Sequence, residues 1–332
     1  MASTDAHQDV NQDSKQYDAL PTELLTSLHV RYIQQLDQNR DLAYHMTQHL
    51  RMNGVYWGLT SLALLNQQDA LPRHEMLDWV MSCYDSQVGA FAPHPGHDTQ
   101  LHSTLSAIQI LAMQDALDLL NIDKITSYIL SLQDPTSGGF AGDEWGEISS
   151  RFVCCAVCAL SLMGQLDKLD KTLTVGFLER CKNFDGGFGM VPDAESHAAY
   201  VWTSVQALAI LDRLDIVDSD LLAWWLCERQ LPNGGLNGRP EKLEDVCYSW
   251  WALATLAILG KSHWIDGSKL SKFILSAQDP DRGGIADRPD DMADVWHTVF
   301  GLAGLSLLSY PGLAEVDPVY CMPASVTRRV LK

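Results

Sequence analysis

An aspartate, a cysteine and a histidine form the set of residues in this sequence best suited to holding a zinc ion. Asp245 and Cys247 stand two residues apart, and His297 follows some fifty residues later in a stretch of similar composition. Three such ligands leave a fourth tetrahedral position open, as in catalytic zinc sites. A substrate thiol bound there would lose its proton and become a nucleophile. The alternative is structural: a helix cap at Asp245, a core cysteine and a satisfied polar histidine.

A second group of residues has the character of an anion site. Arg239 and Lys242 precede the Asp-Cys pair, Tyr248 follows it, and His197 and Arg151 stand near the starts of other apolar segments. Arginine makes two-pronged contacts with phosphate oxygens, lysine offers a point charge and tyrosine a neutral donor. If these side chains converge, they favour a diphosphate-like ligand. The alternative is that each is solvated or paired with a neighbouring glutamate.

Aromatic residues gather at the starts of the same apolar segments. They are Trp57, Phe152, Tyr200, Trp202, Trp250, Trp251, Trp296 and Phe300. Such a stripe is usually part of a core. In a barrel wide enough to keep a cavity, it would line a deep apolar pocket suited to a ligand with a charged head and a long hydrocarbon tail.

The elements that must position these residues repeat about every 48 residues. Glycine turns begin at Gly138, Gly186, Gly234 and Gly283, separated by 48, 48 and 49 residues, and Gly89 begins a degenerate copy. A polar loop follows each turn, and then comes an apolar segment rich in Ala and Leu that predicts a buried helix. The apolar segments are 55–65, 103–113, 152–163, 201–211, 250–259 and 299–308. The runs between them, such as 173–181 and 270–277, are charged on one side and predict surface helices.

Repeats of this length are typical of stacked architectures. An open stack would end in polar caps, but the last apolar segment is as apolar as the middle ones. We therefore predict an all-α fold, an α–α barrel with six inner and six outer helices. All inner helices then start at one rim, where Asp245, Cys247 and His297 can converge. Residues 1–17 are predicted to be a disordered polar tail, and 18–332 a single α–α barrel catalytic domain.

Composition restricts the partners and the compartment. The chain has 332 residues, 46% of them hydrophobic and 20% charged, which is typical of a soluble globular protein. A net charge of -19 argues against a nucleic-acid partner. No apolar run is long enough for a membrane span, and the amino terminus lacks the apolar core of a signal peptide. Most of the eight cysteines lie in apolar stretches, so we expect reduced core residues and a cytoplasmic protein.

Two long motifs then identify a resemblance. Residues 234–251 and 283–298 resemble the signature of protein prenyltransferase β subunits, and are most similar to the Rab geranylgeranyltransferase (type II) form. Residues 183–189, 195–197 and 320–323 also match it. The resemblance extends from about residue 20 to the carboxyl terminus and implies an α–α barrel that forms a heterodimer with a helical α subunit.

The resemblance also implies an activity. It is the transfer of geranylgeranyl from geranylgeranyl diphosphate to carboxyl-terminal cysteines of Rab GTPases, which a Rab escort protein presents, by way of a zinc-bound thiolate. The zinc ligands carry over to Asp245, Cys247 and His297, with one Zn²⁺ per β subunit. Residues expected to bind the diphosphate are His197, Arg239, Lys242 and Tyr248, with Arg151 nearby, and Lys242 and Tyr248 are also expected to be catalytic.

Other positions bear on the isoprenoid and on a second metal. The resemblance places Trp251 and Phe152 against the isoprenoid. Asp287 falls where farnesyl-transferring relatives have a carboxylate linked to Mg²⁺, which makes Mg²⁺ plausible here. Asn53 replaces a small residue that helps to set pocket depth in the Rab-type enzyme, so we expect it to affect chain-length selection.

Three other functions remain as alternatives. The chain could be another protein prenyltransferase β subunit, of the farnesyl or type I geranylgeranyl kind. A terpene-cyclase-like enzyme would share a helical ring but would need no Cys-His zinc set. A non-catalytic helical repeat scaffold would bind no zinc, so metal content separates it from the enzymes.

Overall fold

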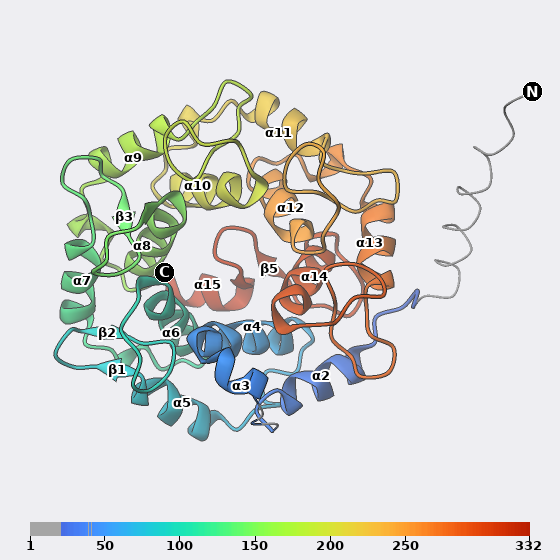
Figure 1. The fold of residues 1–332 in the computed structure, drawn as a ribbon, viewed down its shortest axis with the longest axis horizontal. Helices are drawn as coiled ribbons and strands as arrows, with labels where there is room; N and C mark the ends of the chain where they lie inside the picture. The colour runs from blue at the N-terminus through green and yellow to red at the C-terminus, as the bar shows by residue number, and fades with distance from the viewer. Residues whose placement is uncertain (1–20, 39, 41) are drawn as a thin grey trace, which may run out of the picture.

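The structure is a computed structural model that describes residues 21–38, 40 and 42–332, and its helices form two concentric rings (Figure 1). The inner ring holds α4 (Arg51–Leu64), α6 (Leu101–Met113), α8 (Ser150–Leu162), α10 (Ala198–Ile210), α12 (Tyr248–Ile258) and α14 (Val295–Leu307). The outer ring holds α2 (Thr26–Gln35), α5 (Arg73–Ser82), α7 (Ile122–Ser131), α9 (Lys171–Arg180), α11 (Ser219–Cys227) and α13 (Gly267–Ser276). The predicted α–α barrel and its layers are therefore confirmed.

Shorter elements connect or cap these helices. They are α3 (Leu42–Met46), α15 (Ala324–Val330) and the 3-10 helices η1 (Gln48–Leu50), η2 (Leu117–Leu119), η3 (Leu166–Lys168), η4 (Leu214–Ile216) and η5 (Ser262–Trp264). Antiparallel two-residue strands pair as β1 (Tyr84–Asp85) with β2 (Ala90–Phe91), β3 (Phe140–Ala141) with β4 (Ile148–Ser149), and β5 (Val316–Asp317) with β6 (Met322–Pro323). None of the described helices combines the length and hydrophobicity needed to cross a bilayer.

The two helix layers differ because their sequences differ. Inner helices are apolar around most of their circumference, so nearly all residues of α8 are buried. Four of the outer helices, α7, α9, α11 and α13, begin with capping residues: Asn121, Asp170, Asp218 and Asp266 each accept a hydrogen bond from the backbone N–H three residues later. A cap satisfies an otherwise unpaired donor and fixes where each of these four helices starts. The sequence of these repeats therefore contains the capping residues that mark where their outer helices begin.

Backbone hydrogen bonds join successive repeats at the rim where the inner helices start. The N–H of Ala198 donates to the Gly238 carbonyl at 2.9 Å, and the N–H of Val246 donates to the Asp287 carbonyl at 2.8 Å. Leu101 with Gly142 and Ser150 with Met190 repeat the pattern. Each loop is thus held against the start of the preceding inner helix, which fixes the side chains at the rim.

The ring closes because α14 packs against α4 and α2 completes the outer layer. The turn at Gly283 packs against the backbone of Leu28 in α2, as the turn at Gly234 packs against that of Lys269 in α13. Buried His29 of α2 accepts from the Gly284 N–H at 2.9 Å, and its other ring nitrogen bonds the Gln278 side chain at 2.8 Å. Helix α2, from the amino-terminal part of the chain, therefore provides the outer helix against which the last repeat packs.

The carboxyl-terminal segment lies across the interior of the ring (Figure 1). The Tyr56 hydroxyl donates to the Cys321 carbonyl at 2.7 Å, and the Trp202 indole donates to the Pro318 carbonyl at 3.1 Å. These bonds attach the segment to α4 and α10. The predicted disordered tail, residues 1–17, lies outside the described residues.

Candidate active site

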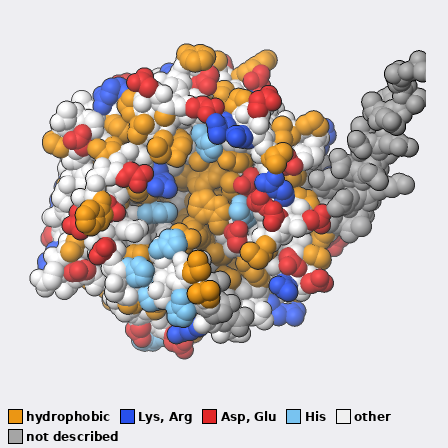
Figure 2. All heavy atoms as spheres, in the orientation of Figure 1, with side chains coloured by type: hydrophobic (Ala, Val, Ile, Leu, Met, Phe, Trp, Pro, Cys, Tyr) orange, Lys and Arg blue, Asp and Glu red, His pale blue; other side chains and the backbone are white. Residues whose placement is uncertain are grey.

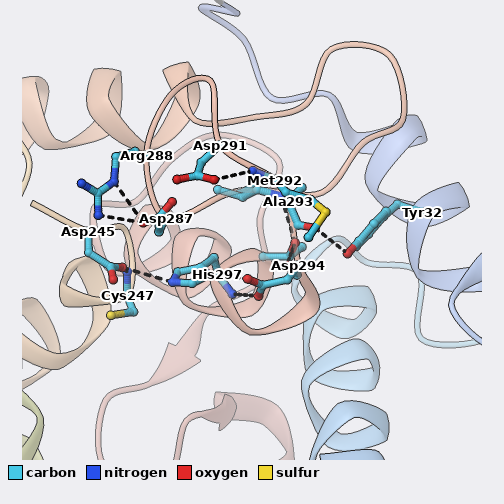
Figure 3. A network of polar contacts seen from close by, with 12 residues as sticks. Tyr32, Asp245, Cys247, Asp287, Arg288, Asp291, Met292, Ala293, Asp294 and His297 are labelled. Carbon is cyan, nitrogen blue, oxygen red and sulfur yellow. Dashed lines mark hydrogen bonds and ion pairs between the residues drawn. The ribbon is translucent and has the colours of Figure 1, made fainter. Parts of the chain in front are cut away.

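The three predicted metal ligands converge at the rim. The ligand atoms of Asp245, Cys247 and His297 all lie within 4.8 Å of one another (Figure 3). Asp245 Oδ1 is 3.3 Å from His297 Nε2 and accepts from the Cys247 N–H at 2.7 Å. Oxygen, sulfur and nitrogen donors at this spacing fit a zinc ion with one position left for a substrate.

Local structure explains why His297 is aimed at the site. Asp294 caps α14, accepting from the His297 N–H at 2.8 Å, and its second oxygen lies 2.6 Å from His297 Nδ1. This fixes the ring and leaves Nε2 directed at Asp245, the arrangement typical of metal-binding histidines. Burial lowers the pKa of His297, but hydrogen bonds to Asp245 and Asp294 outweigh burial and raise it to about 9.

The Cys247 thiol, like the His297 ring, is held in its protonated form. Burial, with the nearby Asp245 carboxylate, raises the pKa of Cys247 well above its usual value. A metal ion would reverse this preference, because coordination deprotonates a thiol outright. Asp245 and Cys247 come from the turn before α12 and His297 from α14, two inner helices that pack side by side.

A polar pocket of about 530 Å³ adjoins the ligand cluster. Its walls are His197, Gly238, Arg239, Glu241, Lys242, Leu243, Asp245, Tyr248 and Arg288. The four predicted diphosphate residues therefore line one pocket together with a metal ligand. Arg239, whose side chain is partly exposed to solvent, forms an ion pair with the exposed Glu195.

Tyr248 is arranged to donate a hydrogen bond into this pocket, and His197 holds its hydroxyl in place. Burial, aided by Arg239, lowers the pKa of His197, which keeps the ring neutral. Its Nδ1 accepts from the Ala199 N–H at 3.2 Å, so Nε2 carries the hydrogen and donates to the Tyr248 hydroxyl oxygen at 3.3 Å. The Tyr248 O–H remains available as a donor, and burial raises its pKa so that the proton stays on.

A second, larger cavity of about 1640 Å³ opens beside the polar pocket and runs into the ring. Figure 2 shows hydrophobic side chains lining the hollow at the centre of this face, with charged side chains around its edge. Predicted aromatic residues on its wall are Trp57, Tyr200, Trp202, Trp251, Trp296 and Phe300. His197 and Arg239 line both cavities, so they mark the junction between the polar and apolar spaces.

Three predicted residues lie elsewhere than on the cavity wall. Phe152 packs against Gly142 and Trp250 is fully buried, so both belong to the core. The buried Asn53 amide donates to Ser106 Oγ at 2.8 Å, and it is Ser106 that lines the cavity. Any effect of Asn53 on the cavity therefore passes through Ser106. Arg151 lies at the cavity wall, where its guanidinium covers the Phe152 ring at 4.8 Å.

The structure adds wall residues that sequence reasoning missed. His102 lies on the cavity wall, and burial, with Arg151 nearby, lowers its pKa to about 4. Tyr320 and Cys321 reach the cavity from the carboxyl-terminal segment. Arg288 lines the polar pocket. Repeat position was a usable signal for Arg288, since it stands where Arg239 stands one repeat earlier. His102 likewise stands 13 residues after Gly89, as Arg151 stands 13 residues after Gly138, and Tyr320 and Cys321 belong to the motif at 320–323.

Comparison with known proteins agrees with this geometry. The profile of the prenyltransferase alpha-alpha toroid domain matches residues 24–322. Geranylgeranyl transferase type-2 subunit beta from Saccharomyces cerevisiae is 52% identical over 316 residues, covering 93% of this chain and 97% of that protein. The chain belongs to this prenyltransferase family.

Other relatives place it within the family. Geranylgeranyl transferase type-2 subunit beta 1 of Arabidopsis thaliana is 50% identical, covering 93% of this chain and 96% of that protein. The Schizosaccharomyces pombe type-2 subunit beta is 46% identical, covering 92% of this chain and 98% of its own length. The chain is thus a prenyltransferase of the type-2 β-subunit group.

Solved structures confirm the prenyltransferase fold. Candida albicans protein geranylgeranyltransferase-I, complexed with GGPP, matches with a TM-score of 0.84 at 22% identity, covering 93% of this chain and 100% of that one. The type II terpene cyclase MstE from Scytonema matches with a TM-score of 0.57 at 12% identity, covering 80% and 88%. The helical ring is therefore shared with a terpene cyclase.

Proposed function

We propose that this chain is the catalytic β subunit of a Rab geranylgeranyltransferase, transferring geranylgeranyl from geranylgeranyl diphosphate to carboxyl-terminal cysteines of Rab GTPases. One observation carries the proposal: the metal-ligand cluster, the polar pocket and the apolar cavity meet at one point of the rim. A thiol, a diphosphate and a hydrocarbon chain each have a matching environment there. The near-full-length type-2 relatives support the choice of isoprenoid and reaction.

The apolar cavity would hold the isoprenoid. Trp251 packs edge-on against Trp202, with ring centroids 5.1 Å apart, and contacts Phe300 at 4.6 Å. These rings form a fixed aromatic wall that excludes water from the hydrocarbon. Because His197 and Arg239 stand at the cavity mouth, a bound chain would place its first carbon there and its diphosphate in the polar pocket.

The polar pocket would stabilise the departing diphosphate. Arg239 and Lys242 supply positive charge, and Tyr248 supplies a neutral O–H donor that His197 holds in place. Negative charge develops on the leaving group as the bond to carbon breaks, so fixed donors act most strongly at that moment. Removing one such donor typically costs about 3 kcal/mol in the transition state.

Asp245, Cys247 and His297 would hold Zn²⁺, since their donor set and spacing fit that ion. Bound zinc would supply the chemistry that keeps a substrate cysteine deprotonated at neutral pH. Asp294 keeps the His297 ring in the orientation that this requires. The residue assignments rest on the pocket geometry together with the matching sequence motifs.

The proposal includes partners and a location. The chain would act as a heterodimer with a prenyltransferase α subunit, in the cytoplasm, on Rab proteins presented by a Rab escort protein. Residues 18–332 would form the catalytic domain. Exposed apolar side chains such as Trp145, Phe184 and Met292 leave surface available for protein contacts.

Co-expression with an α subunit and a prenylation assay test the function. We expect transfer to a Rab–escort complex with geranylgeranyl diphosphate, at a kcat/KM at least tenfold above that with farnesyl diphosphate. A preference for farnesyl diphosphate would overturn the isoprenoid assignment and favour another prenyltransferase β subunit. Absence of both transfer and stoichiometric zinc would favour a non-catalytic scaffold. The same assay on Asn53→Ser tests whether position 53 affects chain-length selection through Ser106.

A further inference from the structure

Arg288 is a cation of the polar pocket that the residue assignments above leave without a role. Its guanidinium is one-third exposed and forms part of the same wall as Lys242 and Tyr248. Asp245 of the metal-ligand cluster lines the same pocket as Arg288. A cation in this position faces the space assigned to the diphosphate.

Arg288 also occupies a repeated position. Arg239 and Arg288 each follow a glycine pair by the same number of residues, and each precedes a proline, at Pro240 and Pro289. The glycine turns of these two repeats, at Gly234 and Gly283, are themselves equivalent. The rim therefore presents two arginines from adjacent loops to one pocket.

Asp287 holds Arg288 in this place. Arg288 Nε and Nη2 lie 3.0 and 2.8 Å from Asp287 Oδ2, and the Asp287 side chain is only 22% exposed (Figure 3). The Asp287 carbonyl in turn accepts from the Val246 N–H at 2.8 Å. Val246 lies between the metal ligands Asp245 and Cys247, so the pair is anchored to the ligand segment itself.

We propose that Arg288 binds the diphosphate of the isoprenoid substrate, and that Asp287 is its positioning residue. The proposal rests on the function proposed above and adds a residue to it. A guanidinium can donate two parallel hydrogen bonds to phosphate oxygens, and Asp287 engages only part of its five N–H groups. Both hydrogen bonds from Arg288 go to the same Asp287 oxygen, Oδ2.

Equilibrium binding to the α–β heterodimer tests this inference with two probes, geranylgeranyl diphosphate and the uncharged alcohol geranylgeraniol. Arg288→Ala should raise the Kd for the diphosphate roughly 10- to 100-fold, because a charge-assisted contact is lost. Its Kd for the alcohol should stay within twofold, since the apolar cavity is untouched. Arg288→Lys should recover part of the diphosphate affinity.

Asp287→Asn tests the positioning role. We expect a smaller rise in the diphosphate Kd than for Arg288→Ala, and no further rise when both changes are combined. Arg282→Ala is the matched control, because Arg282 is an exposed arginine six residues earlier that lies outside the polar pocket. It should leave both Kd values within twofold of wild type.

Separate outcomes overturn separate claims. If wild type binds geranylgeranyl diphosphate tightly and Arg288→Ala binds it equally well, the Arg288 inference is wrong. If Arg288→Ala raises the Kd for the diphosphate and the Kd for the alcohol by the same factor, the Arg288–Asp287 ion pair has only a structural role. If Asp287→Asn abolishes Mg²⁺ dependence of transfer while diphosphate affinity is unchanged, Asp287 is a Mg²⁺ ligand. If wild type binds neither probe, it is the proposed function that fails.

Discussion

At the scale of single residues, Asp294 does two jobs with one carboxylate. One oxygen caps α14 by accepting from the His297 N–H, and the other bonds the His297 ring. The cap that starts the helix therefore also orients a candidate metal ligand. One carboxylate can make both bonds, because the backbone N–H and the side chain of the third residue after a helix cap lie close to the capping side chain. The catalytic geometry is built into the start of the helix.

The first prediction concerns Cys247. Cys247→Ala should remove stoichiometric zinc and lower the rate of transfer by at least about a hundredfold, since one of three protein ligands is lost. Metal analysis of the purified heterodimer and single-turnover kinetics measure the two effects. Cys227→Ala is the control, because Cys227 lies on outer helix α11. Retention of one zinc per heterodimer and full activity in Cys247→Ala would remove the metal assignment.

At the scale of elements, a glycine in the loop before an inner helix determines how closely an aromatic side chain of that helix can pack against the loop. A Cβ at Gly238 would lie 2.4 Å from the Tyr248 ring, and one at Gly142 would lie 2.3 Å from Phe152. Glycine therefore allows the tip of an aromatic ring of the following helix to pack closely against the loop. In the case of Tyr248, this contact holds the hydroxyl at the polar pocket.

The second prediction follows from this contact. Gly238→Ala should displace the Tyr248 ring and lower kcat/KM at least about tenfold, with a loss of about 1 to 3 kcal/mol in stability from overpacking. Steady-state kinetics and denaturant unfolding measure both quantities. Gly176→Ala, in outer helix α9, is the control: its new Cβ meets only Arg180 at 3.6 Å. The control should gain roughly 0.5 to 1 kcal/mol and keep its activity.

At the scale of the whole molecule, closure of the ring depends on contacts between the two ends of the repeat array. Each glycine turn needs an outer helix to pack against, and the last turn finds it in α2. His29 is the centre of that contact and is fully buried. Burial lowers its pKa more than the Gln278 hydrogen bond raises it, so the folded ring is neutral.

The third prediction is a pH dependence of stability at this closure. The folded pKa of His29 lies below the unfolded value of about 6.5, so the unfolded state binds more protons in acid. Its contribution is complete above about pH 6.5 and is lost as the pH falls below that value. Urea unfolding at pH 5.5 and 7.5 should show a smaller difference for His29→Gln than for wild type. Identical differences would exclude His29 as a source, because other histidines with a lowered pKa, such as His102, act equally in both proteins.

The sequence by itself determined the repeat, the two helix layers and the three candidate metal-ligating residues. Periodic turns and apolar segments fix these features locally, and equal spacing puts Asp245, Cys247 and His297 at equivalent helix starts. The predicted boundaries lie close to those of the structure: the predicted apolar segment 152–163 corresponds to helix α8 at Ser150–Leu162. The repeat thus carried both the fold and the core of the site.

Only the tertiary structure decided which side chains reach the cavities. Phe152 and Trp251 occupy similar places near helix starts, yet Phe152 packs on Gly142 and Trp251 lines the cavity. The packing of His29 against the last repeat, and the entry of Tyr320 into the ring, likewise join residues far apart in the chain. Sequence spacing gives the register of a helix, but the direction of a side chain depends on neighbours that folding brings from elsewhere.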